Sequence, residues 1–153
     1  MPTTTYHGSC HCGAVRFEAD LSLAEGTGKC NCSICTKTRN WSASVKPGAF
    51  RLLAGEEALS DYRFGGGQGA HLFCKHCGVR SFETGHVKEI GGDYVSVKLA
   101  CLDDVDPAEL LESPVSYANG RDNKWWEPPA RSEERRVGKA CWCSCRSPRT
   151  PHH

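Results

Sequence analysis

The chain has 153 residues, close to the common size of one domain, and its formal net charge is +1. Such a balance gives no long-range attraction for nucleic acid or an anionic membrane, so neither is expected as a partner. No apolar run approaches the roughly 20 residues that span a bilayer, and the start MPTTTYHGSC lacks a secretory signal. We therefore predict a cytoplasmic protein whose 11 cysteines are metal ligands or redox groups rather than disulfides.

The body of the chain shows the patterns of short strands. Residues 14–20 alternate apolar and polar side chains as a half-buried strand does, and residues 92–100 alternate more strongly. Residues 41–64 contain short β-prone runs between the turn signals KPG and AGEE. Residues 71–74 and 80–84 are predicted strands on either side of a turn. The sequence thus predicts a mainly β fold of short strands in a meander.

Helical signals are confined to two places. In residues 103–112, DDVDPAELLE, Asp106 can cap a helix whose first position is a proline, with Leu110 and Leu111 facing inward. A second short helical turn is expected after Cys32. One or two short helices therefore accompany the strands.

Residues 131–153, RSEERRVGKACWCSCRSPRTPHH, differ sharply in composition from the rest of the chain. They are rich in arginine and show no core pattern, and their first part resembles the translation of a sequencing-adapter oligonucleotide. The alternatives are a natural disordered tail, or an arginine-rich tail whose Cys141, Cys143 and Cys145 bind a metal or partner. Residues 1–130 are expected to form a single domain.

Seven of the eight cysteines before this tail lie in three clusters: Cys10 and Cys12; Cys30, Cys32 and Cys35; Cys74 and Cys77. A Cys-x-Cys pair on an extended segment projects both sulfurs to one face, whereas a Cys-x-x-Cys pair converges through a tight turn. Gly13 and Gly78 follow the outer pairs and permit the positive φ that turns backbone amides toward sulfur. Together the outer pairs supply four thiolates, which is the closed tetrahedral set of structural zinc; a redox disulfide or an iron–sulfur cluster is the alternative.

The middle cluster supplies only three sulfurs. A zinc ion held there would keep a fourth position for water or a substrate thiolate, as catalytic zinc requires. An incoming thiol would then be deprotonated and ready to add to an aldehyde carbon or to leave from an adduct. The spacing leaves other possibilities open: another division of the cysteines, closure by His71 or His86, or a disulfide between Cys32 and Cys35.

The sequence resembles the glutathione-dependent formaldehyde-activating enzyme family, which includes centromere-protein-V-like proteins. The resemblance runs from Gly8 to about Trp126 and rests on the ordered motifs GSCHCGAVRFEAD, CNCSICTKT, HLFCKHCGVRSFE and VSVKLACLDD. It implies several short coiled, mainly antiparallel β-sheets around a structural zinc. The structural ligands implied by this resemblance are Cys10, Cys12, Cys74 and Cys77. The implied ligands of a second, catalytic-type zinc are Cys30, Cys32 and Cys35.

The resemblance also implies an activity for a zinc-binding, catalytic-type domain of residues 1–130. The implied enzyme is a zinc-dependent carbon–sulfur lyase that acts on a thiol–aldehyde adduct such as S-hydroxymethylglutathione. Its partner would be a small-molecule thiol or thiol adduct, with glutathione as a possible co-substrate. Two alternatives are a zinc-stabilised binding module without catalysis and a redox protein that uses Cys32 and Cys35.

Two groups of side chains near these motifs have two interpretations each. The cationic group is Lys29, Lys37 and Arg39. The aromatic group is Trp41, Trp125 and Trp126. The cations could lower thiol pKa values and hold glutathione carboxylates, or form a solvated face. The aromatic rings could wall a substrate cleft or serve packing. The lone Cys101 follows an apolar strand and is predicted to be a small buried thiol.

Overall fold

The computed structural model describes residues 2–67 and 69–129, so the predicted tail lies outside the described residues. The chain divides into two compact units. The first comprises Met1–Thr27 and Ser42–Pro114, and the second comprises Gly28–Trp41 and the described part of Val115–His153. Most elements are strands, with short helices between them, which confirms the predicted mainly β fold. None of the helices in the described ranges has the length and apolar character that crossing a membrane requires.

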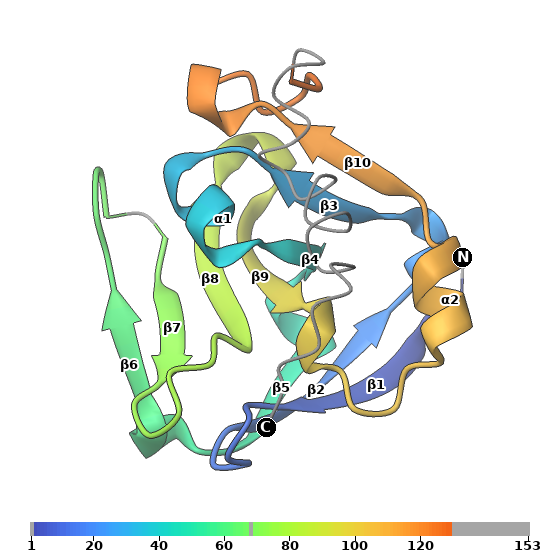
Figure 1. Ribbon diagram of the computed structural model, residues 1–153, viewed down its shortest axis with the longest axis vertical. Helices are drawn as coiled ribbons and strands as arrows, with labels where there is room; N and C mark the ends of the chain where they lie inside the picture. Colours follow the sequence, from blue (N-terminus) through green and yellow to red (C-terminus); the bar gives the residue numbers. More distant parts are fainter. Residues whose placement is uncertain (1, 68, 130–153) are drawn as a thin grey trace, which may run out of the picture. The chain divides into compact units, whose positions relative to one another are not determined.

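The first unit is built from antiparallel strands in separate groups (Figure 1). One sheet consists of β1 (Thr4–Ser9), β2 (Arg16–Leu21) and β5 (Phe50–Ala54). A second group consists of β4 (Trp41–Val45), β9 (Gly92–Lys98) and β8 (Phe82–Val87). A hairpin consists of β6 (Leu59–Tyr62) and β7 (His71–Cys74). The strands predicted from the alternation of apolar and polar residues are therefore present.

The second unit contains the strands β3 (Thr27–Cys30) and β10 (Val115–Ala118), which are hydrogen-bonded neighbours. Helix α1 (Ser33–Thr38) follows β3 and confirms the helical turn predicted after Cys32. The Cys32 sulfur caps the helix by accepting a hydrogen bond from the Cys35 N–H at 3.5 Å. Arg39 ends the helix in the left-handed conformation, with φ of 52°. The local sequence thus fixes where Cys32 and Cys35 lie.

Helix α2 (Pro107–Glu112) begins where the sequence predicts. The Asp106 side chain accepts a hydrogen bond from the backbone N–H of Ala108 at 2.9 Å, and the proline occupies the first turn. Leu110 is half-buried, but Leu111 is 69% exposed, so the prediction that both face inward is wrong for Leu111. Adjacent residues on an α-helix point about 100° apart. A short helix that packs along one side therefore cannot bury both.

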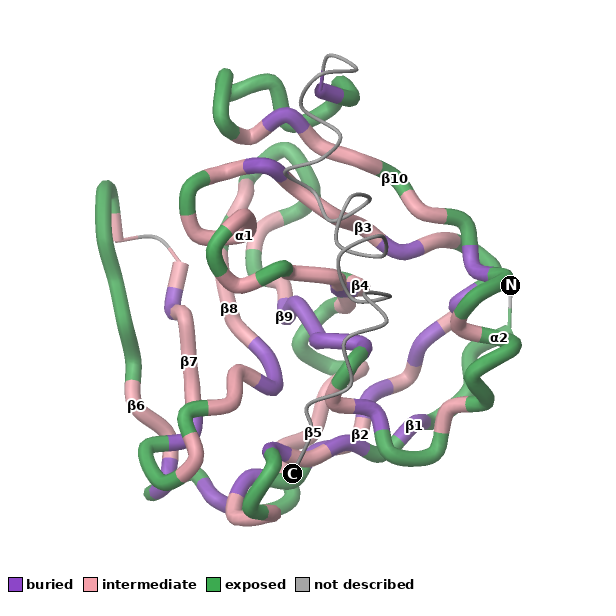
Figure 2. Tube along the Cα trace, in the orientation of Figure 1, coloured by how far each residue is buried: buried purple, intermediate pink, exposed green. Residues whose placement is uncertain are grey.

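The core of the first unit centres on three phenylalanine rings. Phe17 on β2 lies 5.4 Å from Phe50 and 6.2 Å from Phe82, and Phe50 lies 4.6 Å from Phe82, measured between ring centroids. Figure 2 shows buried segments along both β2 and β9. In β9 the polar Ser96 and Lys98 are buried together with their apolar neighbours. Residues 95–98 of β9 are thus buried on both faces of the strand, because alternate side chains point to opposite faces and all four are buried.

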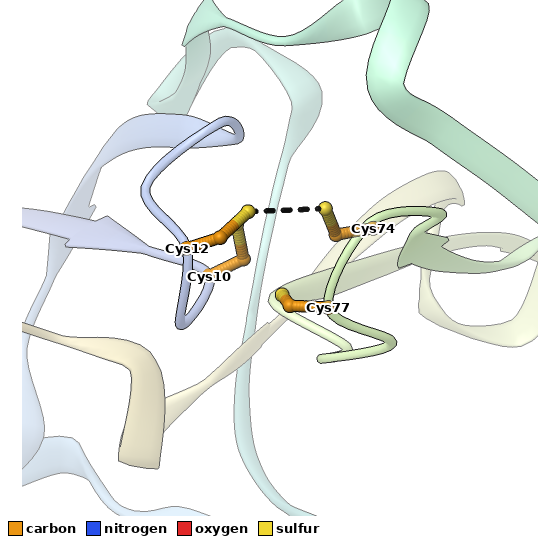
Figure 3. A group of neighbouring side chains, drawn as sticks. All are labelled: Cys10, Cys12, Cys74 and Cys77. Carbon is orange, nitrogen blue, oxygen red and sulfur yellow. Dashed lines mark hydrogen bonds between the residues drawn. The ribbon is translucent and has the colours of Figure 1, made fainter.

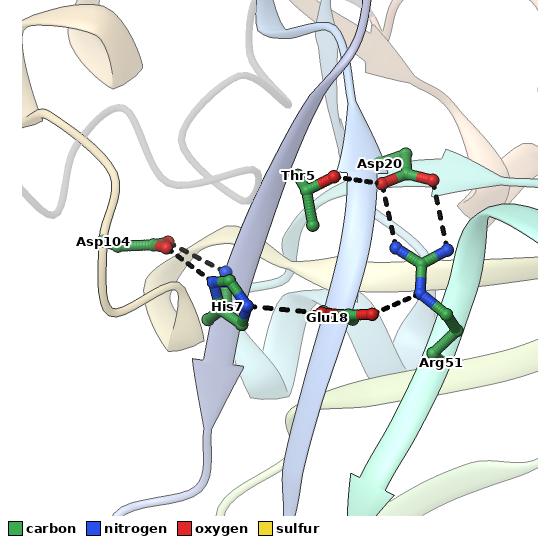
Figure 4. A network of polar contacts seen from close by, with 6 residues as sticks. All are labelled: Thr5, His7, Glu18, Asp20, Arg51 and Asp104. Carbon is green, nitrogen blue, oxygen red and sulfur yellow. Dashed lines mark hydrogen bonds and ion pairs between the residues drawn. The ribbon is translucent and has the colours of Figure 1, made fainter.

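A polar network ties β1 to the loop before α2 (Figure 4). The Nδ1 atom of His7 lies 2.9 Å from Asp104 Oδ2, and its Nε2 atom lies 3.2 Å from Glu18 Oε2. The backbone N–H of His7 also donates to Asp104 Oδ1 at 2.9 Å. Glu18 in turn pairs with Arg51 on β5. The hydrogen bond to Asp104 raises the pKa of His7 above its ordinary value of 6.5.

This raised pKa predicts a pH dependence of stability. Protonated His7 should stabilise the fold fully below the unfolded pKa of about 6.5, and this contribution should disappear as pH rises through the higher folded pKa. We expect the difference in urea midpoint between the natural chain and His7→Gln to be larger near pH 6 than near pH 9. In an Asp104→Asn background this pH dependence should become smaller, with the Glu18 contact left to sustain the remainder. Equal differences at both pH values in the natural background would contradict the assignment.

Candidate metal centres

The first candidate centre lies between two loops of the first unit, the β1–β2 turn and the β7–β8 turn (Figure 3). Its ligand set is Cys10, Cys12, Cys74 and Cys77, whose sulfurs all lie within 4.8 Å of one another. The Cys12 sulfur lies 3.6 Å from that of Cys10 and 3.7 Å from that of Cys74. Four sulfurs about 2.3 Å from one tetrahedral zinc ion would lie roughly 3.8 Å apart. The thiol set therefore fits structural zinc in number and spacing.

The two loops of this centre share one backbone pattern. Gly13 N donates to Cys10 O at 3.2 Å, and Gly78 N donates to Cys74 O at 2.7 Å. Both glycines have the expected positive φ, 80° for Gly13 and 77° for Gly78. The N–H of Val15 also points at the Cys10 sulfur, at 3.3 Å. Backbone donors aimed at sulfur favour the thiolate form that metal ions bind.

Other backbone donors act on a sulfur of the second loop. Hydrogen bonding from the backbone N–H of Cys12, and then of Val79, lowers the pKa of Cys77 to about 6. Cys10 and Cys74 are buried, whereas Cys12 is exposed and Cys77 is half-buried. Two of the sulfurs are thus shielded from solvent, as suits a centre that joins two loops and supports the fold.

The second candidate centre lies within the second unit. Cys30 ends β3, Cys32 caps α1 and Cys35 lies in its first turn, and the three sulfurs lie within 4.8 Å of one another. The N–H of Cys32 donates to the Cys30 sulfur at 3.3 Å, and the side-chain amide of Asn40 donates to the Cys35 sulfur at 3.6 Å. Each of the three thiols is half-buried. Among the described residues, no fourth His, Cys, Asp or Glu atom joins this group.

The three thiols of this centre do not titrate alike. Hydrogen bonds from Cys30 and then Cys35 hold the pKa of Cys32 far below the usual range of a thiol. The same contacts raise the pKa values of Cys30 and Cys35, because these two thiols keep their protons beside the Cys32 thiolate. The group therefore loses one proton readily, and a divalent cation would displace the remaining two. This donor set fits a soft, thiolate-binding metal such as zinc.

The histidines considered as closing ligands have other partners. His71 Nδ1 lies 2.9 Å from Glu83, whose other oxygen pairs with the buried Lys98 at 3.0 Å. Burial opposes ionisation of Glu83, but its contacts with Lys98 and then His71 together outweigh burial and lower its pKa. His86 Nδ1 lies 2.7 Å from Asp93. In the described part of the chain, neither ring belongs to a cysteine group.

The flanking residues have separate local roles. The Lys29 ammonium lies 5.2 Å from the centroid of the Trp41 ring, a cation–π contact within the second unit. Arg39 is the residue that ends α1. The lone Cys101 is half-buried, its thiol donates to the Arg80 carbonyl at 3.6 Å, and burial raises its pKa. Cys101 therefore has the environment of an unreactive thiol.

Asn31, between two cysteines of the second centre, is a residue that the sequence patterns did not indicate. It is fully buried, and its side-chain amide donates to Asn119 Oδ1 at 2.9 Å while accepting from the Arg121 N–H at 3.0 Å. Its own N–H donates to the Ala118 carbonyl at 3.2 Å. The amide thus fixes the segment after β10 to the cysteine segment. An asparagine between two ligands looks like a spacer, so nothing local marks this role.

We expect Asn31→Ala to loosen residues 119–127 and to lower the free energy of unfolding by about 1–3 kcal/mol, because Asn119 Oδ1 and the Arg121 N–H lose a buried partner. Hydrogen exchange followed by mass spectrometry should show faster exchange in that segment, and urea denaturation should show the loss of stability. Asn31→Asp should do the same, since its second oxygen would face Asn119 Oδ1. Unchanged protection in both variants would contradict this role.

The chain is similar to known proteins over most of the described residues. The family model for the glutathione-dependent formaldehyde-activating enzyme matches residues 5–118, a range that includes all seven clustered cysteines. The structure is also similar to the crystal structure of a Rhodobacter sphaeroides protein, described as a Northeast Structural Genomics target. That protein is 32% identical, with a TM-score of 0.60, and the match covers 72% of this chain and 99% of that chain. Residues 119–129 lie beyond the family match.

Proposed function

The chain belongs to the glutathione-dependent formaldehyde-activating enzyme family, and on that premise we propose that it is a zinc-dependent carbon–sulfur lyase for thiol–aldehyde adducts such as S-hydroxymethylglutathione. One observation carries the proposal: the second centre gathers three cysteine sulfurs, whereas the first gathers four. A four-thiolate set is closed, but a three-thiolate set leaves one position for a substrate atom. The proposed roles are therefore structural for the first centre and catalytic for the second.

The proposed residues are divided between two zinc ions. The structural ion would be held by Cys10, Cys12, Cys74 and Cys77. The catalytic ion would be held by Cys30, Cys32 and Cys35. When bound at the second centre, zinc supplies a Lewis acid that lowers the pKa of a thiol and accepts it in the fourth position. Because both centres need reduced thiols, we place the proposed activity in the cytoplasm.

The reaction balances without a redox partner. In the lyase direction the carbon–sulfur bond of the adduct breaks and its electron pair remains on sulfur, while the hydroxyl group loses its proton and becomes the carbonyl of the released aldehyde. The sulfur takes up a proton when the free thiol departs, and the reverse steps form the adduct. In this scheme the backbone N–H of Cys32 and the Asn40 amide orient the ligand sulfurs. Lys37 and Arg39 would attract the carboxylates of glutathione.

The test combines metal analysis with an exchange assay on reduced, anaerobically purified full-length chain. We expect about two zinc ions per chain, and faster exchange of ¹³C-formaldehyde with glutathione, in proportion to protein concentration, than in buffer alone. The Cys32→Ser chain provides the reference zinc content and the reference exchange rate for a protein that lacks one proposed ligand of the second centre. About one zinc ion and no acceleration would overturn the proposal and favour the zinc-stabilised binding module. A reversible disulfide with no second metal would favour the redox alternative.

A further inference from the structure

The segment that follows β10 forms a closed loop inside the second unit. Its ends are joined by hydrogen bonds from Asn119 N to Glu127 O at 2.9 Å and from Lys124 N to Asn119 O at 2.9 Å. The Asn119 amide also donates to Asp122 at 2.9 Å. Together with the Asn31 contacts described above, these bonds place the side chains of the loop in fixed positions beside the cysteine segment. We call residues 119–127 the tryptophan loop, because they include two adjacent tryptophans.

Gly120 shows how closely this loop approaches the second centre. A methyl group on Gly120 would lie 2.7 Å from the Cys30 sulfur and 2.4 Å from atom Cζ3 of the Trp125 ring. A side chain at this position would force the Trp125 ring or the Cys30 sulfur to move. The distance between Trp125 Cζ3 and the Cys30 sulfur therefore cannot exceed the sum of these two distances. The indole lies directly beside one ligand of the proposed catalytic ion.

The Trp125 ring is oriented but incompletely covered. Its Nε1–H donates to Asn123 Oδ1 at 2.7 Å, and Asn123 itself has the left-handed conformation with φ of 59°. The side chain nevertheless remains 47% exposed. A large apolar ring that is held in one orientation beside a proposed metal ligand, and still faces solvent, can cover an apolar group of a molecule bound at the second centre.

We propose that Trp125 is a specificity-determining residue of the second centre, whose indole packs against an apolar or planar group next to the sulfur of the bound thiol or thiol adduct. This inference rests on the proposed function, because it requires a thiol to bind at Cys30, Cys32 and Cys35. The substrate class is then a thiol adduct that carries an apolar or planar group, such as a hydrocarbon, an aromatic ring or a peptide amide, within two or three bonds of its sulfur. An adduct without such a group would leave the ring exposed and gain nothing from it.

The test measures thiol affinity rather than turnover. The full chain is loaded with Co²⁺, whose thiolate absorption bands report each sulfur that joins the ion, and is titrated with benzyl mercaptan and with ethanethiol. The Cys32→Ser chain, also loaded with Co²⁺, gives the spectrum of the four-cysteine centre for subtraction. We expect the ratio of the two affinities to fall by roughly 2- to 10-fold in Trp125→Ala, the range of one aromatic contact.

Two further variants separate the ring from its surroundings. Trp126→Ala removes the neighbouring ring, which is 72% exposed, and should leave the preference for the aromatic thiol unchanged. Gly120→Ala should reduce the preference, because its methyl group would displace the Trp125 ring or the Cys30 sulfur. An unchanged affinity ratio in Trp125→Ala, or loss of the preference for the aromatic thiol in Trp126→Ala, would overturn the inference about Trp125. Neither result would affect the proposed function. If neither thiol alters the cobalt spectrum of the natural chain, the proposed function fails and the inference fails with it.

Discussion

The Cys32→Ser chain is expected to fold, to lose about one zinc ion and to accelerate adduct exchange no faster than buffer does. Serine is among the preferred residues at the start of a helix, so its oxygen can accept the Cys35 N–H hydrogen bond that the Cys32 sulfur accepts. A neutral hydroxyl is, however, a poor ligand for the soft metal ions that thiolates select. The substitution thus removes a proposed metal ligand while keeping the helix cap. Elemental analysis, circular dichroism and the exchange assay measure the three outcomes.

Two comparison variants sharpen this prediction. Cys32→Ala removes both the ligand and the cap, so it should cost a further 0.5–2 kcal/mol or so in unfolding free energy relative to Cys32→Ser. Cys101→Ala removes a thiol that lies outside both cysteine groups, and it should keep full zinc content and turnover. Turnover that survives in Cys32→Ser would show that the second centre does not carry the reaction. Full zinc content in the same variant would show that the ligand set is assigned wrongly.

The sequence predicts those parts of the centres that depend on neighbouring residues alone. Gly13 and Gly78 each follow a cysteine pair, and each adopts the positive φ that the pattern requires. The helix after Cys32 forms because its cap and its first turn belong to one short segment. Asp106 starts α2 for the same reason. In each case the determining hydrogen bond joins residues that are close in the chain, so the residue types are sufficient to indicate the structure.

The sequence does not predict features that arise from contacts between distant segments. Asn31 and Arg121 meet only because β3 and β10 are neighbours in the second unit. The reason for a glycine at position 120 becomes evident only from the closeness of Cys30 and Trp125 in the folded chain. The burial of residues 95–98 of β9 on both faces depends on the segments that pack over the sheet, and the alternation of its residues conceals that burial. Such features follow from tertiary neighbours, which one sequence does not identify.

Cys74→Ser is expected to unfold the chain rather than only weaken it. Cys74 is fully buried, and its sulfur lies 3.7 Å from that of Cys12 across the two loops of the first centre. Structural zinc in small domains contributes about 10–16 kcal/mol of apparent binding free energy. A domain of this size has a total stability of only about 5–15 kcal/mol. Loss of the ion, together with a buried hydroxyl in place of a ligand, should therefore exceed the stability that the rest of the core supplies.

Circular dichroism and size-exclusion chromatography of the purified variant, with and without added zinc, measure this outcome. Cys101→Ser is the matched control: it makes the same atomic change at a half-buried thiol of the same unit, but outside the four-cysteine group. The control should retain its fold and its zinc. The two cysteine centres should also differ from each other, because Cys32→Ser is expected to fold and Cys74→Ser is not. A folded, zinc-replete Cys74→Ser chain would contradict a structural role for the first centre and require its ligands to be reassigned.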